Sequence, residues 1–146
     1  MTAPVAPKTA KPPSHVHVRW AGEQLFQAGR PNAPMAHIDG NGKLGQSPPE
    51  ALLSALASCV SVDVVEILAK RRTPVKSLEI DIVGERVDTT PRRYKHITLS
   101  FRIAGKGIEK DQALRAIELA ATKYCSVRDS LRSDIVIDWT VELHGE

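Results

Sequence analysis

Two cysteines, Cys59 and Cys125, are the residues of this chain best suited to redox chemistry. Cys59 lies within an almost unbroken apolar segment, residues 54–68 ("SALASCVSVDVVEIL"), and Cys125 follows 66 positions later in "TKYCSV". A peroxide-reducing dithiol needs two such thiols, one to attack the O–O bond and one to resolve the sulfenic acid. A packing role for Cys59 fits equally well, because free cysteine is among the most buried residue types. The residues alone leave both interpretations open.

Three other motifs fit known kinds of site poorly. "GNGKLG" at residues 40–45 matches the spacing of a dinucleotide-binding loop, but two prolines follow it and Asp63 falls inside a helical pattern. His15 and His17 share one face of an expected strand and lack a third metal ligand nearby. "RRYKH" at residues 92–96 has no basic helix or regular aromatic interleaving beside it. We therefore expect no metal, no organic cofactor and no nucleic-acid partner.

Length and composition are those of a single globular domain. The chain has 146 residues, 42% of them hydrophobic, and a formal net charge of only +3. No apolar run approaches the roughly 20 residues of a membrane span, and "MTAPVAPKTAKPP" lacks the apolar region of a signal peptide. We expect a cytoplasmic protein without a membrane partner. Residues 1–13 are expected to be a disordered tail, and residues 14–146 a single domain.

A long helix is expected to carry Cys59. Ser47 offers a capping hydroxyl before "PPEALL", and "KRR" places cations at the other end, so the helix is predicted to span residues 48–71. Its middle is apolar on nearly every face, which predicts burial all round, in the core or at a subunit interface. Glu50 lies in its first turn, nine residues and about two and a half turns before Cys59.

The remaining pattern predicts an α+β fold with antiparallel sheet and segregated helices. Strands are expected at residues 15–20, 23–28 and 34–39 before the long helix, then at 77–87, 94–103 and 134–143 after it. An amphipathic helix is expected at residues 107–124. A short helical stretch is expected at residues 126–133, directly after Cys125.

"SPPEALLSALASCVSVDVV" followed by "ATKYCSV" resembles the OsmC/Ohr family of small thiol peroxidases, and most closely its OsmC-like branch. The resemblance covers the chain from about His15 onward. It implies an intertwined homodimer with a swapped sheet and active sites at the interface. It also implies that Cys59 is the peroxidatic cysteine and Cys125 the resolving cysteine. Glu50 lies one position from the glutamate that holds the family's arginine.

The family's peroxidase members carry that arginine in the first hairpin loop, where it stabilises the thiolate. Here the turn reads "WAGEQLFQ", with Glu23 near the place, while Arg19 and Arg30 lie in the preceding strand and a later loop. Without a nearby cation, burial raises the pKa of a thiol. Cys59 is therefore expected to be largely protonated near neutral pH.

The function expected from the resemblance is reduction of organic hydroperoxides through a sulfenic acid and a disulfide, which an external dithiol then reduces. In the family a lipoyl dithiol can serve as that reductant. Apolar walls from Leu52, Leu56 and Val60, or from the same residues across a dimer, would favour an organic peroxide over hydrogen peroxide. Two alternatives use the same fold: a module that binds a hydrophobic small molecule at the dimer interface, and a redox sensor that forms the disulfide without fast turnover.

Overall fold

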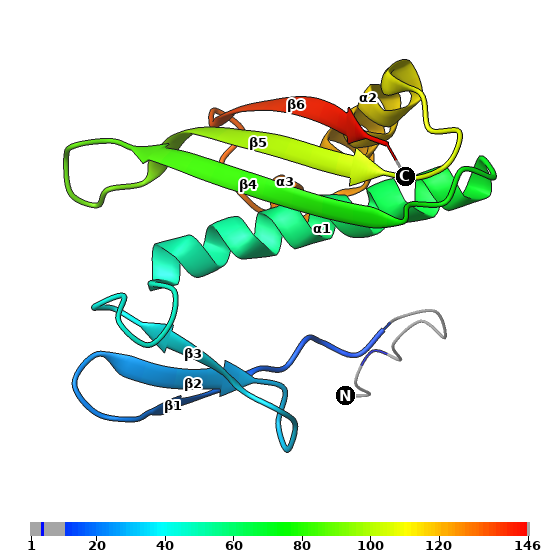
Figure 1. Ribbon diagram of the computed structural model, residues 1–146. Coiled ribbons are helices and arrows are strands. Elements are labelled where there is room, and N and C mark those ends of the chain that lie inside the picture. Colours follow the sequence, from blue (N-terminus) through cyan, green and yellow to red (C-terminus); the bar gives the residue numbers. More distant parts are fainter. Residues whose placement is uncertain (1–3, 5–10, 146) are drawn as a thin grey trace. The chain divides into compact units, whose positions relative to one another are not determined.

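The computed structural model describes residue 4 and residues 11–145 of the chain. Contacts divide it after Pro48 into two compact units, drawn as ribbons in Figure 1, and each unit is described by itself. Most of the tail expected at residues 1–13 lies outside the described residues.

The first unit is a three-stranded antiparallel sheet in the order β1-β2-β3. The three strands predicted before the long helix are confirmed. Its strands are β1 (His17–Trp20), β2 (Leu25–Gly29) and β3 (Ala36–Asp39). The β1–β2 turn passes through Gly22, whose positive φ of 105° favours glycine, and through Glu23, whose φ is 48°. Glu23 is therefore a turn residue.

One face of this first sheet is apolar and largely exposed. The register pairs Trp20 with Phe26, and Phe26 with Ile38, so these side chains point to the same side. Trp20 is 65% exposed, and Val18 on the same face is 57% exposed. Contiguous exposed apolar side chains of this kind often mark an interaction surface.

The second unit holds a mixed sheet in the order β4-β5-β6, made of β4 (Ser77–Arg86), β5 (Tyr94–Ala104) and β6 (Val136–His144). β4 and β5 are antiparallel, but β6 runs parallel to β5. The α+β class is confirmed, and the expectation of a wholly antiparallel sheet is wrong. A parallel neighbour needs a long crossover, and the helices between β5 and β6 provide it.

Four helical segments belong to the second unit: α1 (Pro48–Lys70), which begins at the boundary, α2 (Lys110–Leu119), η1 (Ala120–Tyr124) and α3 (Ser126–Asp129). The predicted long helix is confirmed, and it ends at Lys70, one residue before the predicted end. The single helix predicted for residues 107–124 is instead an α-helix whose last turn widens into a π-helix, η1. Such π-turns occur frequently at functional sites.

The core of the second unit lies between α1 and the inward face of β5. Its largest fully buried side chains come mainly from these two elements: Leu56, Val60, Val64, Leu68, Ile97, Leu99, Phe101 and Ile103. Every second residue of β5, the central strand, points inward. These side chains form the surface on which α1 packs.

Within one chain, burial of α1 is confined to a single stripe. Val62 is 58% exposed, Val65 41% and Leu52 40%. Against the expectation that no apolar run is long enough, α1 could cross a bilayer by length and composition, with mean hydropathy 1.9. A core helix of a globular unit has the same composition, and the buried stripe of α1 packs against the sheet.

Replacing Phe101 with alanine is predicted to lower the free energy of unfolding by about 3–5 kcal/mol, because the side chain is 1% exposed at the centre of this core. Denaturant unfolding at one fixed protein concentration measures the change. Val83→Ala, at a position 62% exposed on β4, is the control and should change stability by less than about 0.5 kcal/mol. A loss of similar size in both variants would contradict this description of the core.

Candidate active site: a dithiol at a helix break

The break between η1 and α3 positions Cys125. Its N–H donates to the carbonyl of Ala120 at 2.9 Å, and its backbone then turns extended, with φ −75° and ψ 106°. This conformation makes Cys125 the N-cap of α3, where its Sγ accepts a hydrogen bond from the Arg128 N–H at 3.3 Å. The sulfur thus stabilises the first turn of α3.

The fold brings Cys59 and Cys125 together. Cys59, halfway along α1, is half-buried, and Cys125 is 4% exposed. Both are free thiols, and they hydrogen-bond to each other within one chain. The two predicted redox residues therefore share one site.

The pKa of the Cys59 thiol lies below its ordinary value. Burial acts to raise it, but hydrogen bonds from the Val127 N–H, the Cys125 thiol, and the hydroxyl and N–H of Ser126 outweigh burial. The expectation of a raised pKa, based on burial without a cation, is wrong. The first turn of α3 supplies neutral donors to the thiolate.

The pKa of the Cys125 thiol is raised to about 11. Burial is the largest cause, and the neighbouring Cys59 raises it further through hydrogen bonding and charge, while the N–H groups of Arg128 and Val127 act in the opposite direction. Of the two thiols, Cys59 therefore ionises at the lower pH, and a Cys125 that is still protonated donates to it. An ionised thiol is the nucleophilic form.

Glu50 lies apart from this pair along α1. Nine residues of helix separate it from Cys59, about 13.5 Å of axial rise. The Glu50 carboxylate affects the pKa of Tyr94. Burial raises the pKa of that phenol, the charge of Arg86 acts to lower it, and the charge of Glu50 acts to raise it. Arg19, in the first unit, donates to the Gln27 side chain.

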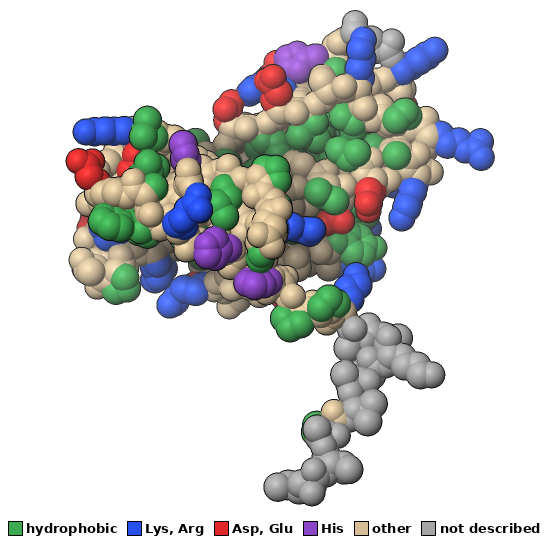
Figure 2. All heavy atoms as spheres, turned by 90° about the horizontal axis from the view of Figure 1, so that it is seen from below, with side chains coloured by type: hydrophobic (Ala, Val, Ile, Leu, Met, Phe, Trp, Pro, Cys, Tyr) green, Lys and Arg blue, Asp and Glu red, His purple; other side chains and the backbone are tan. Residues whose placement is uncertain are grey.

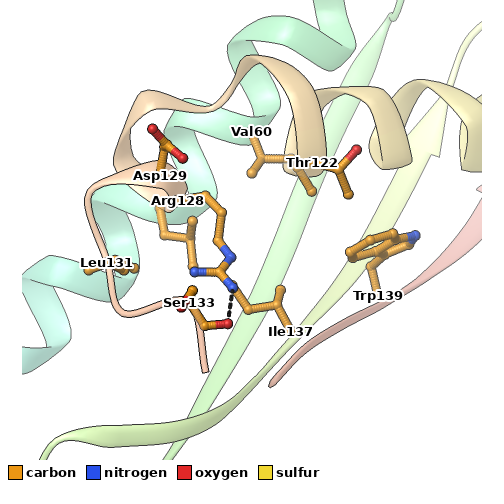
Figure 3. Close-up of a pocket in the computed structure, with 10 residues that line it drawn as sticks. Val60, Thr122, Arg128, Asp129, Leu131, Ser133, Ile137 and Trp139 are labelled. Atoms are coloured by element: carbon orange, nitrogen blue, oxygen red, sulfur yellow. Dashed lines mark hydrogen bonds between the residues drawn. The ribbon is translucent and has the colours of Figure 1, made fainter. Parts of the chain in front are cut away.

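Arg128 is a site residue that the sequence analysis missed. Its backbone N–H holds Cys125, while its guanidinium donates to the carbonyl oxygens of Arg132 at 2.9 Å, Ser133 at 3.4 Å and Ile135 at 3.1 Å. Figure 3 shows the guanidinium reaching toward Ser133 and Ile137. The available signal was its place three residues after Cys125, which is one turn into the following helix.

A cavity of about 370 Å³ lies in the second unit beside α3. Leu56 and Val60 contribute to its wall, but neither cysteine does. Leu52, the third residue expected to form apolar walls, does not line this cavity and is 40% exposed within one chain. Among residue 4 and residues 11–145, no cluster of three histidine, cysteine or acidic side chains has the arrangement of a metal site.

Comparison with known proteins gives a consistent result. The family described as OsmC-like protein matches residues 40–140. The chain is 34% identical over 127 residues to Protein YhfA of Escherichia coli K12, covering 86% of this chain and 95% of that protein.

Solved structures share the fold. A hypothetical protein from Aquifex aeolicus superposes with a TM-score of 0.78 at 28% identity, over 92% of this chain and 99% of that one. An organic hydroperoxide resistance protein, OsmC, from Legionella pneumophila superposes with a TM-score of 0.64 at 11% identity, over 90% and 99%. This second likeness is one of fold.

Replacing Ser126 with alanine is predicted to raise the pKa of Cys59, because a donor to the thiolate is lost. The rate of Cys59 alkylation by iodoacetamide near neutral pH should fall roughly two- to tenfold, the size expected for one hydrogen bond. The modified cysteine is identified by peptide mass spectrometry.

Ser130→Ala is the matched control, because the Ser130 hydroxyl donates at the other end of α3, to the Ser126 carbonyl. It should leave the Cys59 rate unchanged. Equal rates in both variants and the unaltered protein would show that the Ser126 donor does not set the reactivity of Cys59.

Proposed function

The chain belongs to the OsmC-like protein family, and on that basis we propose that it is a thiol-dependent peroxidase for organic hydroperoxides. The observation that carries the proposal is the charge arrangement of the dithiol: the pKa of Cys59 is lowered beside a Cys125 thiol whose pKa is raised. Solved structures of the same fold include proteins named for organic hydroperoxide resistance.

The first step is attack by the Cys59 thiolate on the distal oxygen of the hydroperoxide. A new S–O bond forms as the O–O bond breaks, Cys59 is oxidised to the sulfenic acid, and the alkoxide leaves and takes a proton to become the alcohol. The N–H groups of Ser126 and Val127 face the sulfur and hold the charge before attack.

The second step activates Cys125. The charge on Cys59 contributes to the raised pKa of Cys125, so its loss on oxidation removes one obstacle to ionising the second thiol. Cys125 then attacks the sulfenic sulfur, a disulfide forms and water leaves. An external dithiol, for which the family offers the lipoyl kind, reduces the disulfide by exchange and is itself oxidised. The resolving thiol becomes reactive after its partner has reacted.

We also propose that the protein works as a cytoplasmic homodimer. The exposed apolar side of α1 borders a groove of about 660 Å³ between α1 and the edge strand β4, lined by Val62, Val65, Leu78, Ile80 and Ile82 among others. The first sheet independently exposes Val18 and Trp20. Hydrophobic side chains (green) are visible on the face drawn in Figure 2. A second copy is the occupant that the family's intertwined dimers suggest, and it would cover these surfaces.

Cumene hydroperoxide is predicted to be consumed catalytically by the protein in the presence of dihydrolipoamide. Cys59→Ser should abolish consumption, because the pKa of the other described thiol, Cys125, is raised to about 11. Cys125→Ser should consume a single equivalent and leave a Cys59 sulfenic acid that dimedone traps. Peroxide loss and intact-protein mass are measured together.

Other outcomes select the alternatives. Stoichiometric disulfide formation with poor recycling would favour a redox sensor. The absence of both turnover and disulfide, together with tight binding of an apolar probe, would favour a binding module. Either result contradicts the peroxidase.

Val62→Asp is predicted to convert the dimer to a monomer, because a charge would be placed on the exposed apolar side of α1. Light scattering after size exclusion measures the mass. Val83→Asp is the matched control, since Val83 is 62% exposed and Val62 58%. A monomeric unaltered protein, or equal masses for both variants, would rule out this interface.

A further inference from the structure

The cavity beside α3 has the composition of a small-molecule site. Its volume of about 370 Å³ lies within the range of ligand pockets. Leu56 and Val60 of α1, Leu131, and Ile137 and Trp139 of β6 provide apolar and aromatic walls. Figure 3 shows the Trp139 ring and the Arg128 side chain projecting toward the same space. The cavity therefore combines apolar walls with one cationic side chain, Arg128, and one carboxylate, Asp129.

The charge of Arg128 is not neutralised by the part of the chain that the structure describes. Its three guanidinium hydrogen bonds all go to backbone carbonyl oxygens, which are neutral acceptors. A guanidinium has five N–H donors, so the Nε–H and one Nη1–H remain without a partner among the described residues. Carboxylates pair with such donors in charge-assisted hydrogen bonds.

Asp129 limits the charge that a ligand can carry. It also lines the cavity, and Figure 3 shows its carboxylate on the far side of the backbone from the Arg128 guanidinium. A second negative group on the ligand would meet no second cation among the described lining residues, and Asp129 adds a negative charge to that lining. A monoanion with an apolar body satisfies both the free donors of Arg128 and the hydrophobic walls.

We propose that this cavity binds a small monocarboxylate with an apolar tail, the carboxylate on Arg128 and the tail against Leu131, Ile137 and Trp139. The site differs from the dithiol, because neither cysteine lines it. The two are adjacent through α3: the Arg128 N–H holds the Cys125 sulfur, and the Arg128 side chain faces the ligand. A ligand in the cavity would therefore bind the same residue, Arg128, whose N–H donates to the sulfur of Cys125.

Octanoate is the probe, and tryptophan fluorescence is the readout. The chain has two tryptophans, so Trp20→Phe leaves Trp139 as the sole reporter. Octanoate should quench or shift Trp139 emission saturably. Octanol and octylammonium, which share the tail but not the charge, should bind at least about tenfold more weakly, the minimum expected for a hydrogen bond to a charged group. Equal binding of octanol would overturn the proposal, because the cation would then play no part.

Two variants in that background test the placement. Arg128→Gln should weaken octanoate binding at least about tenfold, with far-ultraviolet circular dichroism confirming the fold. Arg128 also anchors residues 132–135, so Thr122→Phe serves as the second variant. Thr122 is exposed and lines the cavity, and a phenyl group there fills the cavity while leaving Arg128 intact. Unchanged octanoate affinity in Thr122→Phe would overturn the site even if Arg128→Gln does not fold.

Discussion

The hydrogen bonds that the first turn of α3 gives to two sulfur atoms are the constraint around which the second unit is organised. Arg128 donates to Cys125, and Ser126 and Val127 lower the pKa of Cys59. Both effects require α3 to begin immediately after Cys125, and the π-turn η1 sets that point by closing on Ala120. The buried stripe of α1 then fixes where Cys59 meets it. Neutral hydrogen-bond donors can therefore lower the pKa of a thiol without a cation beside it.

Much of the architecture was predictable, because it rests on periodicity. Alternation in residues 94–103 and the apolar run around Cys59 gave β5 and α1 with nearly the observed bounds. The parallel direction of β6 was not predictable from its own alternation, since the pattern of one strand says nothing about its neighbour's direction. The π-turn was also invisible, because "AATKY" fits an ordinary helix.

The sequence predicted which two cysteines form the candidate site, but it did not predict the hydrogen bonds that shift their pKa values. The two cysteines could be selected by type and by family pattern, and the fold places them in contact. The thiolate stabilisation comes from backbone N–H groups, which every residue has, so no side chain marks it in the sequence. Arg128 carries no motif of its own, because its role depends on α3 beginning directly after Cys125. Its guanidinium holds residues 132–135 and faces a cavity.

The central claim is that Cys59 ionises at a lower pH than Cys125 and is therefore the nucleophile of the dithiol. Titration of thiolate ultraviolet absorbance against pH, with Cys59→Ser and Cys125→Ser in parallel, tests it most directly. The account predicts an inflection below the ordinary thiol range that survives in Cys125→Ser and disappears in Cys59→Ser, where the remaining thiol ionises only at higher pH. A low inflection that survives in Cys59→Ser and disappears in Cys125→Ser would contradict it.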